Sequence, residues 1–90
     1  MTSSEVVKQL ELAQAATQAA INALNSLIVP HDYQDVAAFV AKASLQLLQA
    51  THALMQSDDT RAFAAIEQAD ELLDGAFEII DSELEDDEEA

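Results

Sequence analysis

Carboxylate side chains recur at helical spacing in the second half of the chain. Because an α-helix has 3.6 residues per turn, residues alternately four and three apart lie along one helix face. Such a face attracts basic groups over several turns, although each pair of like charges costs the helix about 0.2–0.5 kcal/mol. The candidate partner-binding residues, here called the acidic row, are Glu67, Glu71, Asp74, Glu78 and Asp81.

No catalytic or metal-binding motif accompanies these carboxylates. Gly75 is the only glycine and the chain has no cysteine, so it has neither a glycine-rich phosphate loop nor a thiolate for zinc or for catalysis. No glutamate precedes His31 or His52 at the spacing of helical di-metal sites. The acidic segments lack the glycine and the ligand spacing of a calcium loop. The sequence therefore predicts a non-enzymatic protein without cofactor, metal or small-molecule substrate.

The charge balance constrains the partner. The 90 residues include 18 acidic and 3 basic side chains, which gives a net charge of −15. Direct binding to nucleic acid or to an anionic membrane requires basic contacts to phosphate, and only Lys8, Lys42 and Arg61 could make them. We therefore expect a basic protein partner. Without cysteine, an apolar run of membrane-spanning length or a signal-peptide pattern, the expected location is the cytoplasm.

The apolar pattern predicts an all-α fold. Apolar residues recur every three or four positions in segments that we expect to form helices over about 4–29, 35–56 and 59–83. Pro30 ends the first segment, and short connections predict antiparallel neighbours. The expected fold is an up-down-up three-helix bundle, complete in one chain or completed by dimerisation, spanning 1–84, with a frayed acidic tail over 85–90. The residues of the third helix predicted to face the core are Ala62, Ile66, Ala69, Leu73, Ala76 and Ile80, with Phe63 and Phe77 beside them.

The first two predicted helices contain long stretches without charge. Residues 12–31 and 43–57 include no Asp, Glu, Lys or Arg. Depletion of charge is typical of the buried centre of a protein–protein interface, although a polar surface of amides would show the same pattern. We therefore expect homodimer formation through an uncharged face. Its candidate residues are Gln14, Gln18, Asn22, Gln46 and Ala50.

Two functional hypotheses follow from these patterns. In the first, the acidic row docks on and masks a basic surface of a partner protein. One form of this hypothesis is nucleic-acid mimicry of the kind used by phage inhibitors, because carboxylates about one turn apart resemble a row of phosphates. In the second, the protein is a homodimeric adaptor or a chaperone-like protein that uses the uncharged faces of its first two helices. A purely solubilising role for the acids is the remaining alternative.

Overall fold

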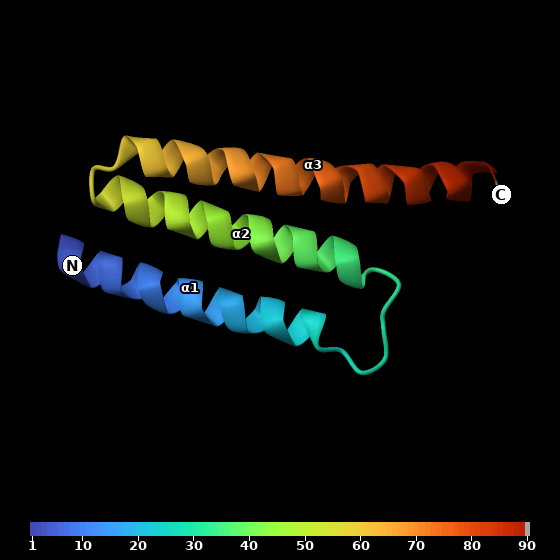
Figure 1. The fold of residues 1–90 in the computed structure, drawn as a ribbon, viewed down its shortest axis with the longest axis horizontal. Helices are drawn as coiled ribbons and strands as arrows, with labels where there is room; N and C mark the ends of the chain where they lie inside the picture. The colour runs from blue at the N-terminus through green and yellow to red at the C-terminus, as the bar shows by residue number, and fades with distance from the viewer. Residues whose placement is uncertain (90) are drawn as a thin grey trace.

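Three α-helices form the chain, in the predicted up-down-up order (Figure 1). They are α1 (Ser3–Asn25), α2 (Gln34–Met55) and α3 (Asp59–Glu89). The computed structural model describes the backbone of residues 1–89 and the side chains of residues 1–84. Within that part of the chain, no helix combines the length and the apolar character needed to cross a membrane. The all-α, antiparallel fold class predicted from the sequence is confirmed.

The helices lie side by side in a layer with α2 in the middle (Figure 1). α2 contacts both of its neighbours, whereas α1 and α3 do not approach each other within the described residues. The molecule measures 54 × 28 × 19 Å. Because a helix with its side chains is about 10–12 Å across, the thinnest dimension is less than two helix diameters. Both broad faces of the layer are therefore open to solvent.

Alanine is the most frequent residue at the buried positions of α2 and α3. Of the ten apolar side chains buried among residues 1–84, eight are alanine, and the other two are Ile21 and Val36. Small side chains let neighbouring helices approach closely, because the interaxial distance depends on the residues at the contact. The buried alanines are Ala38, Ala43, Ala50 and Ala53 of α2 and Ala62, Ala65, Ala69 and Ala76 of α3. Large apolar side chains such as Leu47, Ile66 and Leu73 meanwhile remain more than 40% exposed.

α1 ends at Asn25, four residues before its predicted end. Ile28 and Val29 are β-branched, which disfavours helix, and Pro30 cannot be accommodated inside one. In place of a further helical turn, Nε2 of the Gln34 side chain donates a 2.7 Å hydrogen bond to the carbonyl oxygen of Leu24, in the last turn of α1. The first connection is therefore longer than predicted and is tied to the start of α2.

α3 extends to Glu89, six residues beyond its predicted end. The segment after Glu83 contains neither glycine nor proline, so nothing in it interrupts helical backbone geometry. The side chains of residues 85–90, and Ala90 altogether, lie outside the described part of the structure. The predicted acidic tail over those residues stays a prediction.

A three-residue turn joins α2 to α3. The Ser57 N–H donates to the Leu54 carbonyl at 3.0 Å, and the Asp58 N–H donates to the Ala53 carbonyl at 2.9 Å. These two bonds form a Schellman motif, which places Ser57 in the left-handed region at φ 58°. Asp58 then caps α3, because its Oδ1 accepts a 3.1 Å hydrogen bond from the Arg61 N–H. The turn therefore fixes both helix ends within three residues.

Replacement of Ser57 by glycine is expected to stabilise the protein. A left-handed conformation costs a residue with a Cβ about 1–2 kcal/mol, and the larger backbone entropy of unfolded glycine offsets part of that gain. We expect Ser57→Gly to raise the free energy of unfolding by about 0.5–1 kcal/mol, as measured by urea denaturation. Ser26→Gly is the matched control, because Ser26 ends α1 at φ −107°. A loss of stability in both variants would contradict the prediction.

Candidate functional site

All five residues of the acidic row are exposed along α3. None of them lies within ion-pair distance of a lysine, an arginine or a histidine among the side chains that the structure describes. Solvent and salt therefore provide the only compensation for their charge in that part of the molecule. The acidic row has the exposure that a docking surface for a basic partner requires, and the function itself stays a prediction.

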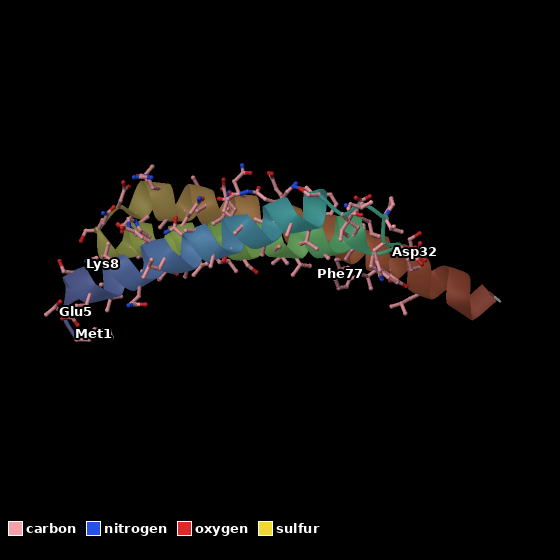
Figure 2. The ribbon with its side chains drawn as sticks, turned by 90° about the horizontal axis from the view of Figure 1, so that it is seen from below. Met1, Glu5, Lys8, Asp32 and Phe77 are labelled. Atoms are coloured by element: carbon pink, nitrogen blue, oxygen red, sulfur yellow. The ribbon has the colours of Figure 1, made fainter. Side chains whose placement is uncertain are left out.

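A row of exposed apolar side chains runs along α3 beside the acidic row. The aromatic members are the most exposed, at 65% for Phe63 and 72% for Phe77. In the edge-on view of Figure 2, Phe77 projects from the lower side of the layer. Asp70 is the one charged residue at the spacing of this row. The α3 apolar row comprises Phe63, Ile66, Leu73, Phe77, Ile80 and Leu84.

The structure divides the predicted core face of α3 in two. Ala62, Ala69 and Ala76 are buried, whereas the isoleucines and the leucine of the same predicted face are 43–47% exposed. The two sets are about 40° apart around the helix, because Ile66 follows Ala62 by four residues. α3 is rotated so that its small side chains contact α2. The large side chains consequently border that contact instead of filling it.

The acidic row flanks the α3 apolar row on the side away from α2. In the sequence, an acidic-row residue directly follows Ile66, Leu73, Phe77 and Ile80. One residue corresponds to a rotation of about 100° around the helix. Going around α3 from the buried alanines, one therefore meets the apolar row first and the carboxylates next. α3 thus presents three adjacent surfaces. The first consists of small buried side chains, the second of large apolar side chains and the third of carboxylates.

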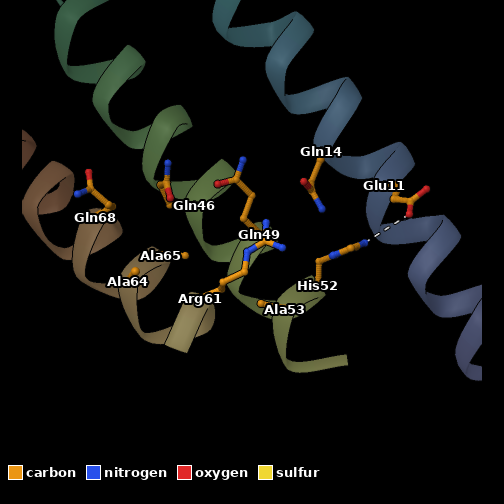
Figure 3. Close-up of a pocket in the computed structure, with 10 residues that line it drawn as sticks. All are labelled: Glu11, Gln14, Gln46, Gln49, His52, Ala53, Arg61, Ala64, Ala65 and Gln68. Atoms are coloured by element: carbon orange, nitrogen blue, oxygen red, sulfur yellow. Dashed lines mark hydrogen bonds and ion pairs between the residues drawn. The ribbon is translucent and has the colours of Figure 1, made fainter. Parts of the chain in front are cut away.

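The two broad sides of the layer differ in chemistry. An open groove of about 490 Å³ on one side is lined by residues of all three helices (Figure 3). Residues two positions apart point about 160° from each other on a helix. Leu47 is two positions from Gln49, and Ile66 is two positions from Ala64 and Gln68. Because Gln49, Ala64 and Gln68 line the groove, the two apolar side chains belong to the opposite side of the layer.

α2 adds its own apolar residues to that opposite side. Val40, Leu47 and Leu54 are each seven residues apart, which places them along one line of the helix. All three are 43–54% exposed. Together with the α3 apolar row they form a surface that we call the open apolar face. It follows the line where α2 meets α3, with the acidic row along its outer edge.

Four of the ten residues that line the groove on the other side are glutamines, and we call it the amide groove. Gln14, Gln46, Gln49 and Gln68 can donate and accept hydrogen bonds there. Nε2 of His52 lies 3.4 Å from Oε1 of Glu11, whose side chain is exposed, so this solvated pair contributes little to stability. Arg61 extends over the same groove (Figure 3). Among the described residues, no three histidine or carboxylate side chains are clustered as metal ligands would be.

The predicted self-association residues occupy three environments. Gln14 and Gln46 are half-buried and line the amide groove together. Gln18 and Asn22 are exposed on α1 and share a 3.1 Å hydrogen bond between their side chains. Ala50 is buried between the helices, so the side chain belongs to the packing of the chain itself. The structure thus brings together only part of the predicted set.

Sequence reasoning missed the open apolar face because it placed Ile66, Leu73 and Ile80 on the core face of α3, with Phe63 and Phe77 beside them. A signal was present, since Ala62, Ala69 and Ala76 repeat every seven residues beside a second row of large residues. Together the two rows form an apolar surface on α3 that is wider than the surface one neighbouring helix can bury. Comparison with protein-family models, curated proteins and solved structures gave no match. We therefore infer the function from the geometry of the two faces.

Proposed function

We propose that the protein is a non-enzymatic binding module that docks on and masks a basic surface of a partner protein. The observation that carries this proposal is the acidic row, in which five exposed carboxylates follow one helix without a basic neighbour among the described side chains. From Glu67 to Asp81 the row extends about 21 Å at 1.5 Å per residue. A solubilising surface has no need of such alignment, whereas a complementary basic surface would contact the whole row.

The neighbouring open apolar face supports the proposal. Burial of apolar surface is the main favourable term in most protein–protein association. Complementary charge chiefly accelerates association and excludes wrong partners. α3 offers both within one element, since four of the five carboxylates directly follow an exposed apolar residue. In this proposal the acidic row orients the partner and the apolar residues hold it. The proposed location of this binding is the cytoplasm.

A nucleic-acid-binding protein is one class of partner that would suit the acidic row. Such proteins carry lysine and arginine arranged to contact successive phosphates. Carboxylates one helical turn apart, at about 5.4 Å, offer those side chains a comparable series of negative charges. In this form of the proposal, the module inhibits its partner by occupying the surface that would otherwise bind nucleic acid.

Charge reversal within the acidic row is expected to weaken binding selectively. We expect Glu71→Lys/Glu78→Lys to lower the affinity for the captured basic partner about tenfold, because each change replaces attraction with repulsion. The partner would be captured from cell extract with the tagged protein, identified by mass spectrometry, purified and titrated at two salt concentrations. Wild-type binding should weaken as salt rises.

Glu5→Lys/Asp32→Lys is the matched control, because both residues are exposed outside the row (Figure 2). Each reversal adds two charges, so both variants change the net charge from −15 to −11. The control should bind within about twofold of wild type. Equal losses in the two variants would assign binding to overall charge. Undiminished binding by the row variant would favour the adaptor function on the amide side.

A further inference from the structure

The open apolar face is long enough to contact one helix along several turns. Along α2 it extends from Val40 to Leu54, which is about 21 Å at 1.5 Å per residue. Along α3 it runs from Phe63 to Leu84. Two cylindrical helices packed side by side leave a shallow depression along their contact line, and we call this strip between the two apolar rows the furrow. A helix of about 14 residues would fill it, as the partner helix does in groove-type peptide recognition.

The secondary structure beneath this face limits what can bind there. An extended peptide binds by main-chain hydrogen bonds to the edge of a sheet. The described backbone has no strand, and helical N–H and C=O groups bond within their own helix. The furrow can therefore recognise only side chains. A helix presents apolar side chains at three- and four-residue intervals along one line, which matches a furrow between two helices.

Charge lies on the α3 side of the furrow only, where Asp70 also interrupts the apolar row. The acidic row lies along its outer edge, on α3. On the α2 side the neighbouring exposed positions are Ala37, Ser44 and Thr51, and α1 beyond them carries no charged residue from Leu12 to its end. An occupant matched to this face would therefore have an apolar face flanked by lysine or arginine along one edge and by uncharged residues along the other.

A second copy of the chain does not meet this description. Each copy brings a net charge of −15, and its three basic residues are too few to pair with five carboxylates. Arg61 moreover lies over the amide groove, on the other side of the layer. Face-to-face pairing of two copies would bring two acidic rows to one interface, with like charges opposed.

We propose that the open apolar face receives one amphipathic α-helix of the partner, basic along a single edge, which packs into the α2–α3 furrow as an added helix. This inference rests on the proposed function and identifies the element of the partner that the module recognises. The apolar residues of that helix contact the furrow, and its basic edge contacts the acidic row. The module then masks a basic helix and not a flat basic surface.

Three synthetic 18-residue peptides test the inference with the full chain. The first carries leucine at three- and four-residue spacing with lysine along one edge. The second has the same composition in scrambled order, without a helical apolar face, and the third replaces lysine by glutamate. Fluorescence anisotropy measures the affinity of each labelled peptide, and circular dichroism follows helix formation on binding. We expect saturable 1:1 binding of the first peptide with a gain of helix, and at least about tenfold weaker binding of the other two.

Leu47→Gln/Phe77→Gln is expected to weaken binding of the first peptide about tenfold or more, because both changes remove apolar contacts from the furrow. Both side chains are exposed in the chain alone, so we expect the variant to keep the fold, and circular dichroism of the variant checks this. Leu12→Gln is the matched control, since Leu12 is 60% exposed on α1, which does not contact α3 within the described residues. It should bind within about twofold of wild type.

The possible failures are distinguishable. Equal affinity for the ordered and scrambled lysine peptides would overturn the helix inference and leave the proposed function standing. No binding of either lysine peptide would overturn both. Equal affinity for the glutamate peptide would overturn the assignment of a basic edge. A dimer in sedimentation that Leu47→Gln/Phe77→Gln dissociates would overturn the choice of a partner helix in favour of a second copy.

Discussion

Truncation of Ile21 to alanine is expected to release α1 from the rest of the molecule. Ile21 is 3% exposed and is the one buried side chain of α1. Removal of a buried isoleucine side chain down to alanine typically costs about 2–5 kcal/mol. Within the described residues, α1 contacts α2 but not α3, so this loss falls on a single helix–helix contact. We expect α1 to open locally while the α2–α3 pair stays folded.

Native-state hydrogen exchange would test this expectation helix by helix. Amides of α1 should lose protection by one or more orders of magnitude in Ile21→Ala, whereas those of α2 and α3 keep most of theirs. Leu12→Ala is the control, because the side chain is 60% exposed on the same helix, and protection should change little. Equal loss of protection in all three helices would mean that the chain unfolds as one unit.

Enlargement of Ala69 to leucine is expected to destabilise the α2–α3 contact. Ala69 is 2% exposed and lies at the middle of the row formed with Ala62 and Ala76. Alanine and leucine have similar helix propensities, so the effect would arise from packing. Extra methylene groups in a close contact typically cost about 1–3 kcal/mol. A chain of this length has a free energy of unfolding of about 5–13 kcal/mol. The substitution would therefore remove a substantial fraction of that free energy.

Urea denaturation would measure the change in the free energy of unfolding. Ala64→Leu is the matched control, because Ala64 is on the same helix but exposed beside the amide groove. It should change the free energy of unfolding by less than about 0.5 kcal/mol. A similar effect of the two substitutions would show that the alanine row does not set the distance between α2 and α3.

The sequence allowed the helices and their order to be predicted, because both depend on local signals. Apolar periodicity, Pro30 and the Ser57–Asp58 turn act over a few residues. The end of α1 was misplaced because it depends on the Gln34–Leu24 hydrogen bond, which joins residues ten positions apart. Such a bond has no signature in a pattern of neighbouring residues.

The rotation of each helix about its axis was harder to predict. Ala62 and Ile66 belong to the same broad apolar face of α3, and apolar periodicity does not distinguish them. The choice between them depends on how closely α2 and α3 approach, and that is a property of both helices. Exposure of the acidic row was predictable, because a carboxylate is rarely buried without a partner. The open apolar face was not, because single-sequence patterns assign large apolar residues to the core.

The arrangement of α2 between its neighbours also has a kinetic consequence. Every helix–helix contact in the described chain joins helices that are consecutive in sequence. No long loop therefore has to close before a native contact forms, and the entropy lost at each closure is small. Proteins with such local topology fold within about microseconds to milliseconds. The chain can thus assemble stepwise, with each helix docking on the one that precedes it in the sequence.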